Sequence, residues 1–183
     1  MPINPHDILT FWQEAGYERW FSRDDVFDAR CREEWLATHH RAARLELDDW
    51  KGTAEGALAL AILLDQIPRN VFRGSGHAYA TDPLARHYAG HAIEHGFDHQ
   101  VDPSLRVFLY MPFEHSEVLA DQERSVALAA SIGGDAGQNY LDYARRHRDV
   151  IARFGRFPHR NRELGRVTSA EEQEYLDAGG GFG

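Results

Sequence analysis

A carboxylate and an imidazole stand next to each other at Glu114 and His115, near the middle of the chain. The pair follows an almost continuous apolar run over 107–111, which is interrupted by Pro112. Carboxyl and imidazole groups are common proton-transfer groups in enzymes, and both also bind ligands through hydrogen bonds. Because the pair directly follows an apolar run, the sequence predicts a polar site built into a core. The pattern alone specifies no reaction.

Three other polar side chains fall on the apolar faces of expected helices. Asp65 continues the apolar face of its helix. Gln122 lies in the middle of such a face over 116–132, and His147 lies at the centre of another. Buried polar groups require partners, so we expect some of these side chains to meet. They could form a structural hydrogen-bond network, a ligand-binding pocket or an acid–base site, and the residues leave all three open.

Asp65 would place a negatively charged side chain in the core. A carboxylate on a buried face has to be paired, hydrogen-bonded or protonated. The loop over 68–74 follows this helix and contains two arginines. These arginines are the expected partners.

Histidines form the most obvious metal-like pattern. His91 and His95 complete an H-x-x-E-H sequence, and His87 and His99 extend the row. The apolar face of this helix lies about 110° away around the helix axis, so the histidines fall on a solvated flank. A catalytic zinc needs a third ligand and a cleft. We therefore expect no metal and no cofactor.

The elements that position these residues are all expected to be helical, because no segment alternates as a half-buried strand does. Helix starts are marked by a capping residue followed by proline or by acidic residues. The expected helices begin at Asn4, Ser22, Thr53, Asp82, Asp102, Ser116, Asp135 and Thr168, and Gly16, Pro68, Gly96, Gly133 and Gly155 end five of them. The prediction is an all-α fold of seven to eight antiparallel helices, with a spacing compatible with a helical-repeat array.

Length and composition bound the organisation. The 183 residues fit one domain, placed at 1–178, and the glycine-rich segment 179–183 is expected to be disordered. The apolar runs are too short to cross a bilayer, and the first residues lack the pattern of a secretion signal. Cys31 is the single cysteine, so no internal disulfide can form. These features predict a cytoplasmic protein.

The net charge of −9 argues against a general nucleic-acid-binding protein. The charge is uneven, since 145–166 contains eight arginines against two acids, a local balance of +6 that leaves −15 for the rest. Arginine offers a rigid fork for carboxylates and phosphates. The plainest interpretation is a helix that pairs with the acidic remainder of the chain.

Three stretches of sequence are long and distinctive. They comprise 64–70 (LDQIPRN) with 73–74 and 80–82, 112–117 (PFEHSE) with 120–125, and 157–161 (FPHRN) with 164–166. As a set they resemble the bacterial domain-of-unknown-function 924 family over nearly the whole chain. The resemblance implies an all-helical, tetratricopeptide-like fold and no established reaction.

The motifs contain four residues that the helical pattern also singles out, whereas His147 rests on its helical position alone. These four are Asp65, Glu114, His115 and Gln122. The resemblance adds further candidates from the same motifs, namely Arg69, Asn70, Arg73, His159, Arg160 and Asn161. Two arginine-bearing loops and a Glu–His pair would suit a small anionic molecule.

The leading hypothesis is a binding module for such a molecule, with five side chains converging on one concavity. These are Asp65, Arg69, Glu114, His115 and His159. One alternative is a hydrolase-like acid–base enzyme that uses Glu114 and His115. Another is a scaffold that binds a peptide on a concave helical surface. A monomer and a homodimer fit the sequence equally.

Overall fold

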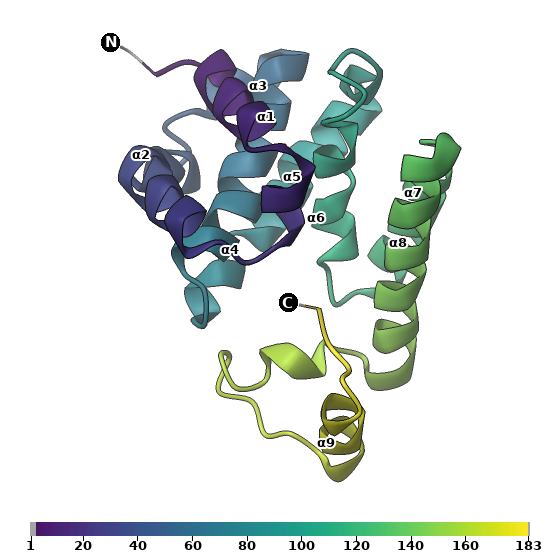
Figure 1. Cartoon of the computed structure of the whole chain (residues 1–183). Coiled ribbons are helices and arrows are strands. Elements are labelled where there is room, and N and C mark those ends of the chain that lie inside the picture. Colours follow the sequence, from purple (N-terminus) through teal and green to yellow (C-terminus); the bar gives the residue numbers. More distant parts are fainter. Residues whose placement is uncertain (1–2, 183) are drawn as a thin grey trace. The chain divides into compact units, whose positions relative to one another are not determined.

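The computed structural model describes residues 3–182, and within them it contains helices and connecting segments but no strand (Figure 1). The helices are α1 (Pro5–Phe21), α2 (Asp25–Ala43), α3 (Ala54–Ala61), α4 (Ile67–Val71), α5 (Asp82–Glu94), α6 (Met111–Glu114), α7 (Leu119–Ala130), α8 (Gly134–Phe154) and α9 (Ala170–Asp177). The predicted all-α class is confirmed. The tetratricopeptide-like arrangement stays a prediction. None of the helices in this range is long and apolar enough to span a bilayer.

The chain folds into two compact units. The single domain over 1–178 stays a prediction. The first unit comprises the residues up to Arg73 together with His77–Pro112. The second unit comprises Gly74–Gly76 and the residues from Phe113 onward. Of the segment 179–183, expected to be disordered, residues 179–182 follow α9 and Gly183 lies outside the described residues.

The first unit is built around α3, which packs against α1 and α5, while α2 packs against α4. Residues 56–61 of α3 are all buried. Gly56 permits this packing, since a Cβ atom at this position would lie 1.9 Å from the Trp50 carbonyl oxygen. On the other side of the core, the Trp12 ring makes an edge-on contact with Phe108, 5.6 Å between centroids. The core is thus formed by one small-residue helix and a cluster of large rings.

The prediction that Pro68 ends the third helix is wrong, because Pro68 lies inside α4. A π-helical turn over 62–66 joins α3 to α4. In this turn the N–H of Ile67 donates to the carbonyl of Ile62, five residues earlier in the chain. The wider turn lets the chain continue as a helix across a residue that lacks an N–H.

Side chains from distant parts of the chain contact two buried carbonyls just before Pro68, which has no N–H to donate. The carbonyl oxygen of Leu63 is 2.8 Å from Nδ1 of His39. The carbonyl oxygen of Leu64 accepts from the Thr81 hydroxyl at 2.6 Å. Both carbonyls belong to fully buried residues, so the two contacts prevent an unsatisfied acceptor in the core.

Replacing Thr81 with valine should lower the free energy of unfolding by about 1–2 kcal/mol, because the buried Leu64 carbonyl loses its hydroxyl donor. Urea denaturation monitored by circular dichroism measures the change. Thr81→Ser is the control, since it keeps the hydroxyl and should stay close to wild type. Equal stability of the valine and serine variants would contradict the argument.

Two other helix boundaries differ from the prediction. The predicted break at Gly16 is present, with φ of 74°, but the segment after it is helical and α1 continues to Phe21. The second helix is capped by Asp24 rather than Ser22, because the Asp24 carboxylate accepts from the Val26 and Phe27 N–H groups. Local capping residues were therefore recognised to within a few positions.

The stretch from 102 onward also differs, since 106–109 forms a 3-10 turn before the short helix α6. Pro112 is part of α6 and does not interrupt it. The next helix begins at Leu119 rather than at Ser116. Ser116 lies in the turn before this helix. Its hydroxyl oxygen accepts a hydrogen bond from the backbone N–H of Val118, with 3.2 Å between oxygen and nitrogen.

The second unit is organised by α7 and α8, which pack side by side (Figure 1). A turn at Gly133 and Gly134 joins them, and both residues have positive φ values, 71° and 67°. Beyond α8, the apolar cluster of this unit consists of Val150, Ile151 and Phe157, with Phe154, Tyr175 and Phe182 packed against it. The packing of Phe157 in this apolar cluster thus holds the irregular segment after α8 in place.

Candidate functional site

In the first unit, Asp65, Arg69 and Asp82 form a buried ionic group. The Arg69 guanidinium binds both oxygens of Asp82, at 2.9 and 3.0 Å, and lies 3.2 Å from the Asp65 carboxylate. Asp65 is 0% exposed. The expected pairing of Asp65 with an arginine from residues 68–74 is confirmed, although Arg69 lies in α4 and not in a loop. Asp65 lies within the π-helical turn and Arg69 follows it in α4, four residues further along the chain.

Two carboxylates around one guanidinium make Arg69 a permanent cation. Burial alone would lower its pKa, but the charges of Asp65 and Asp82 outweigh burial and raise the pKa above its ordinary value. Its neighbour Asn70 donates to the carbonyl of Gln66 at 3.1 Å. Arg73 pairs with Asp28 at 2.7 Å, on the surface. Arg69, Asn70 and Arg73 thus all have partners within the fold.

In the second unit, Glu114 meets His147 rather than only its neighbour in sequence. The carboxyl oxygen Oε1 of Glu114 lies 3.2 Å from Nδ1 of His147, and both residues are buried. The same nitrogen is 2.9 Å from the carbonyl oxygen of Tyr143. Both neighbours of Nδ1 are acceptors, so this nitrogen carries the hydrogen.

His147 is neutral at physiological pH. Burial is the main cause, and it lowers the pKa of His147 to about 3 even though the contact with the Tyr143 carbonyl favours protonation. The nearby His115, Arg160 and His159 lower it further. The contact with Glu114 is therefore a hydrogen bond from a neutral imidazole and not an ion pair.

Aromatic rings surround His147. The ring of Phe182 stacks on the imidazole, with centroids 3.5 Å apart and planes inclined by 14°. Phe157 meets it edge-on at 5.6 Å, and the His115 ring lies 6.3 Å away. The His159 ring contacts Phe157 at 5.5 Å. Three histidines and two phenylalanines thus form one cluster.

Two polar side chains hold the 114–117 turn that carries the first part of this cluster. The amide of Gln122 donates to the carbonyls of Glu114 and Ser116, both at 2.6 Å. The Arg160 guanidinium donates to the carbonyl of His115 at 3.1 Å and lies 4.5 Å from the Phe157 ring centroid. Gln122 is 0% exposed, which explains a polar residue on an apolar helix face.

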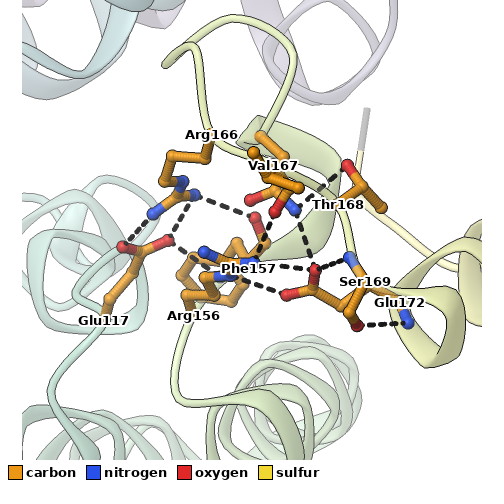
Figure 2. A network of polar contacts seen from close by, with 9 residues as sticks. Glu117, Arg156, Phe157, Arg166, Val167, Thr168, Ser169 and Glu172 are labelled. Atoms are coloured by element: carbon orange, nitrogen blue, oxygen red, sulfur yellow. Dashed lines mark hydrogen bonds and ion pairs between the residues drawn. The ribbon is translucent and has the colours of Figure 1, made fainter.

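A network of ion pairs positions the segment that contains Phe157 (Figure 2). Glu117 binds Arg166 through two contacts, at 2.8 and 3.0 Å. The same carboxylate accepts from the backbone N–H of Phe157 at 2.8 Å. Although burial opposes it, these contacts hold the pKa of Glu117 below its ordinary value. The 157–166 segment is therefore tied to the turn that carries Glu114.

Glu172 is the centre of the other half of this network (Figure 2). Its carboxylate binds Arg156 at 2.6 and 2.8 Å, accepts from the Ser169 N–H at 2.8 Å and accepts from the Asn161 amide at 3.2 Å. The hydrogen bonds from Arg156 are the main reason that the pKa of Glu172 is lowered to about 2. Asn161, a predicted ligand-binding residue, is thus used in this network.

The model of a family described as a bacterial protein of unknown function, DUF924, matches residues 8–180. The chain belongs to the DUF924 family. The family resemblance of the three motifs is thereby confirmed.

One solved structure is similar over nearly the whole DUF924 chain. It is a protein of unknown function from Agrobacterium tumefaciens, 49% identical, with a TM-score of 0.90. The match covers 95% of this chain and 97% of that chain. No curated protein matches the sequence.

The candidate residues of this DUF924 chain fall into two groups. The first unit holds Asp65, Arg69, Asn70 and Arg73, and the second holds Glu114, His115, Gln122, His147, His159, Arg160 and Asn161. Within the second group, the Glu114–His147 contact joins residues from α6 and α8. That Asp65 and Arg69 share a concavity with Glu114, His115 and His159 stays a prediction.

The histidine row of α5 makes a different arrangement. His91 and His95 lie ring on ring, 4.1 Å between centroids, and the nitrogen of His91 contacts the carbonyl of Lys51. Across residues 3–182, no group of three or more potential ligands is placed to hold a metal ion.

Sequence reasoning missed residues whose partners lie far away along the chain. Asp82 was expected only to start a helix; it does so, as the first residue of α5, and it also binds Arg69. Glu172 was not recognised, because the capping box of α9 was placed one residue early, at Thr168 rather than at Ser169. Asp82 and Glu117 both lie in the family motifs, and this position in the motifs is the sequence feature that could have identified them. The local signal for Glu172 is the Ser-x-x-Glu capping box that begins at Ser169.

Proposed function

We propose that the second unit binds a small anionic molecule at the Glu114–His147 cluster. The observation that carries the proposal is the gathering of His115, His159 and Arg160 near His147: the His115 ring lies 6.3 Å from the imidazole, and His159 and Arg160 both contact the Phe157 ring that meets it edge-on. After burial, the main cause, these three side chains lower the pKa of His147 further, and the same side chains would favour an anion beside it. Imidazole and guanidinium N–H groups are suitable donors to a carboxylate or phosphate.

Glu114 has an orienting role in this proposal. By accepting from Nδ1 of His147 it fixes the tautomer and holds the ring in place, as carboxylates commonly do for functional histidines. Arg160 supplies a permanent charge.

Acid–base catalysis is less well supported by this geometry. A general acid or base works best when its pKa lies near the operating pH, and a histidine with a pKa of about 3 is a weak base at neutral pH. The pairing of Glu114 with His147 therefore suits positioning better than proton transfer. Binding is the function that these contacts favour.

The test is titration with inorganic phosphate, followed by NMR of the histidine ring signals. Arg160→Gln should weaken phosphate binding about tenfold, the effect of losing one charge-assisted hydrogen bond. Arg162→Gln is the matched control, because it removes the same charge from an exposed residue of the same segment and should leave the affinity unchanged. Equal loss in both variants, or no saturable binding by wild type below about 10 mM, would contradict the proposal.

A further inference from the structure

The segment 178–182 turns back from α9 and covers one face of His147. The Phe182 ring lies almost parallel to the imidazole at 3.5 Å, and it meets Phe157 and His159 edge-on at 6.1 and 5.8 Å. Phe182 is half-buried, whereas His147 is 6% exposed. The shortest ring-to-ring distance in the cluster is therefore made by Phe182, a residue that follows the last helix.

Glycines make this turn possible. After α9 the N–H of Gly179 donates to the Leu176 carbonyl and that of Gly180 to the Tyr175 carbonyl, at 3.0 and 2.9 Å. These two bonds form a Schellman motif, which reverses the chain direction at the end of a helix. Gly179 has φ of +83°, and a Cβ atom on Gly180 would lie 2.5 Å from the Tyr175 carbonyl oxygen.

The segment is held by backbone bonds only as far as Gly180. Within the described residues, Gly181 and Phe182 make no backbone hydrogen bond, and Phe182 is held by ring contacts. Gly181 has φ of +129°, and no Cβ restricts its backbone. The Phe182 ring can therefore move away from His147 by rotation of the backbone at Gly181, while α9 stays folded.

We propose that Phe182 occupies the position of a flat aromatic group of the ligand, and that the 178–182 segment covers the anion site until an aromatic anion displaces it. This inference rests on the proposed function. The ligand class is a planar ring that carries a carboxylate or phosphate. The ring stacks on His147, and the anionic group is bound by the cationic side chains around it.

The chemistry of the cluster supports this class of ligand. A neutral imidazole stacks on any flat ring, and the site already accommodates one at van der Waals distance. Phe157 and His159 contact the edges of the bound ring, so they restrict its plane. Arg160 lies over the other aromatic ring of the site, Phe157, and provides charge beside the stack. An aliphatic anion would use the charge and leave the stacking face empty.

The test compares wild type with Phe182→Ala in the full chain, using benzoate, cyclohexanecarboxylate and inorganic phosphate as probes. Phe182→Ala should bind benzoate about tenfold more tightly than wild type, because no cover competes with the probe. Phe154→Ala is the matched control, since Phe154 belongs to the same apolar cluster but its ring contacts Tyr175, and its benzoate affinity should equal that of wild type. The NMR signals of the His147 ring report binding directly.

The outcomes separate this inference from the proposed function. Equal benzoate affinity in wild type and Phe182→Ala would contradict the inference that Phe182 covers the site. Equal affinity of Phe182→Ala for benzoate and cyclohexanecarboxylate would contradict the inference that the ligand carries an aromatic ring. If phosphate binds in either case, the proposed anion site stands. No binding of any probe by either protein overturns both. Phe182→Leu keeps apolar packing without a flat ring, and it replaces the alanine variant if that variant does not fold.

Discussion

Replacing Arg69 with methionine should lower the free energy of unfolding by about 3–5 kcal/mol, because the change leaves two carboxylates buried without their counter-charge. Asp65 is fully buried and Asp82 is 6% exposed, so water cannot take over the role of the guanidinium. Arg69 also donates to the main-chain carbonyl of Asp65 at the π-helical turn. The substitution therefore removes both a charge pair and a backbone contact from the connection between α3 and α4.

Arg73→Met is the matched control for this prediction. Arg73 lies four residues further along and pairs with Asp28, but its side chain is 37% exposed. Surface pairs contribute about 0–1 kcal/mol, so the control should stay close to wild type. Urea denaturation at neutral pH measures both variants. If the two arginine variants are equally stable, the buried group contributes little and the argument is wrong.

Much of the fold could be predicted because it depends on local patterns. Capping residues such as Asn4 and Thr53 act within one turn, and apolar stripes at helical spacing indicate which faces are buried. Pro68 shows the limit of local reasoning. Whether a proline ends a helix depends on donors for the carbonyls that it leaves, and these donors, His39 and Thr81, come from distant parts of the sequence.

The candidate site shows the same division between local and distant information. Asp65, Gln122 and His147 could be found because a polar residue on an apolar face must have a partner. Their partners could be guessed only when they were near in sequence, as Arg69 is to Asp65. The contact between Glu114 and His147 joins residues 33 positions apart, and the Phe182 contact depends on a glycine turn that the composition suggested to be disordered. Such pairings are set by packing, which a helical period does not encode.

Replacing Glu172 with glutamine should lower the free energy of unfolding at neutral pH by about 2–3 kcal/mol. The value lies below that for a fully buried pair because the side chain of Arg156 is 32% exposed. Glutamine keeps the size of the side chain and removes the charge that binds Arg156. Glu171→Gln is the matched control: Glu171 is the adjacent residue, its side chain is 62% exposed, and its pair with Arg153 should contribute at most about 1 kcal/mol.

The pH dependence provides the sharper test of the same contact. The pKa of Glu172 is about 2 in the folded chain, against an ordinary value of 4.5, mainly because Arg156 binds the carboxylate. A lowered pKa in the folded state means that the carboxylate stabilises the fold fully above pH 4.5, and that this contribution is lost as the pH falls toward 2. The difference in unfolding free energy between wild type and Glu172→Gln should therefore shrink over that range, while the small difference for Glu171→Gln changes little. Measuring both variants in urea from neutral pH downward subtracts the titration of all other groups, so a difference that stays constant with pH would exclude an ionised Glu172 as the source of the stabilisation.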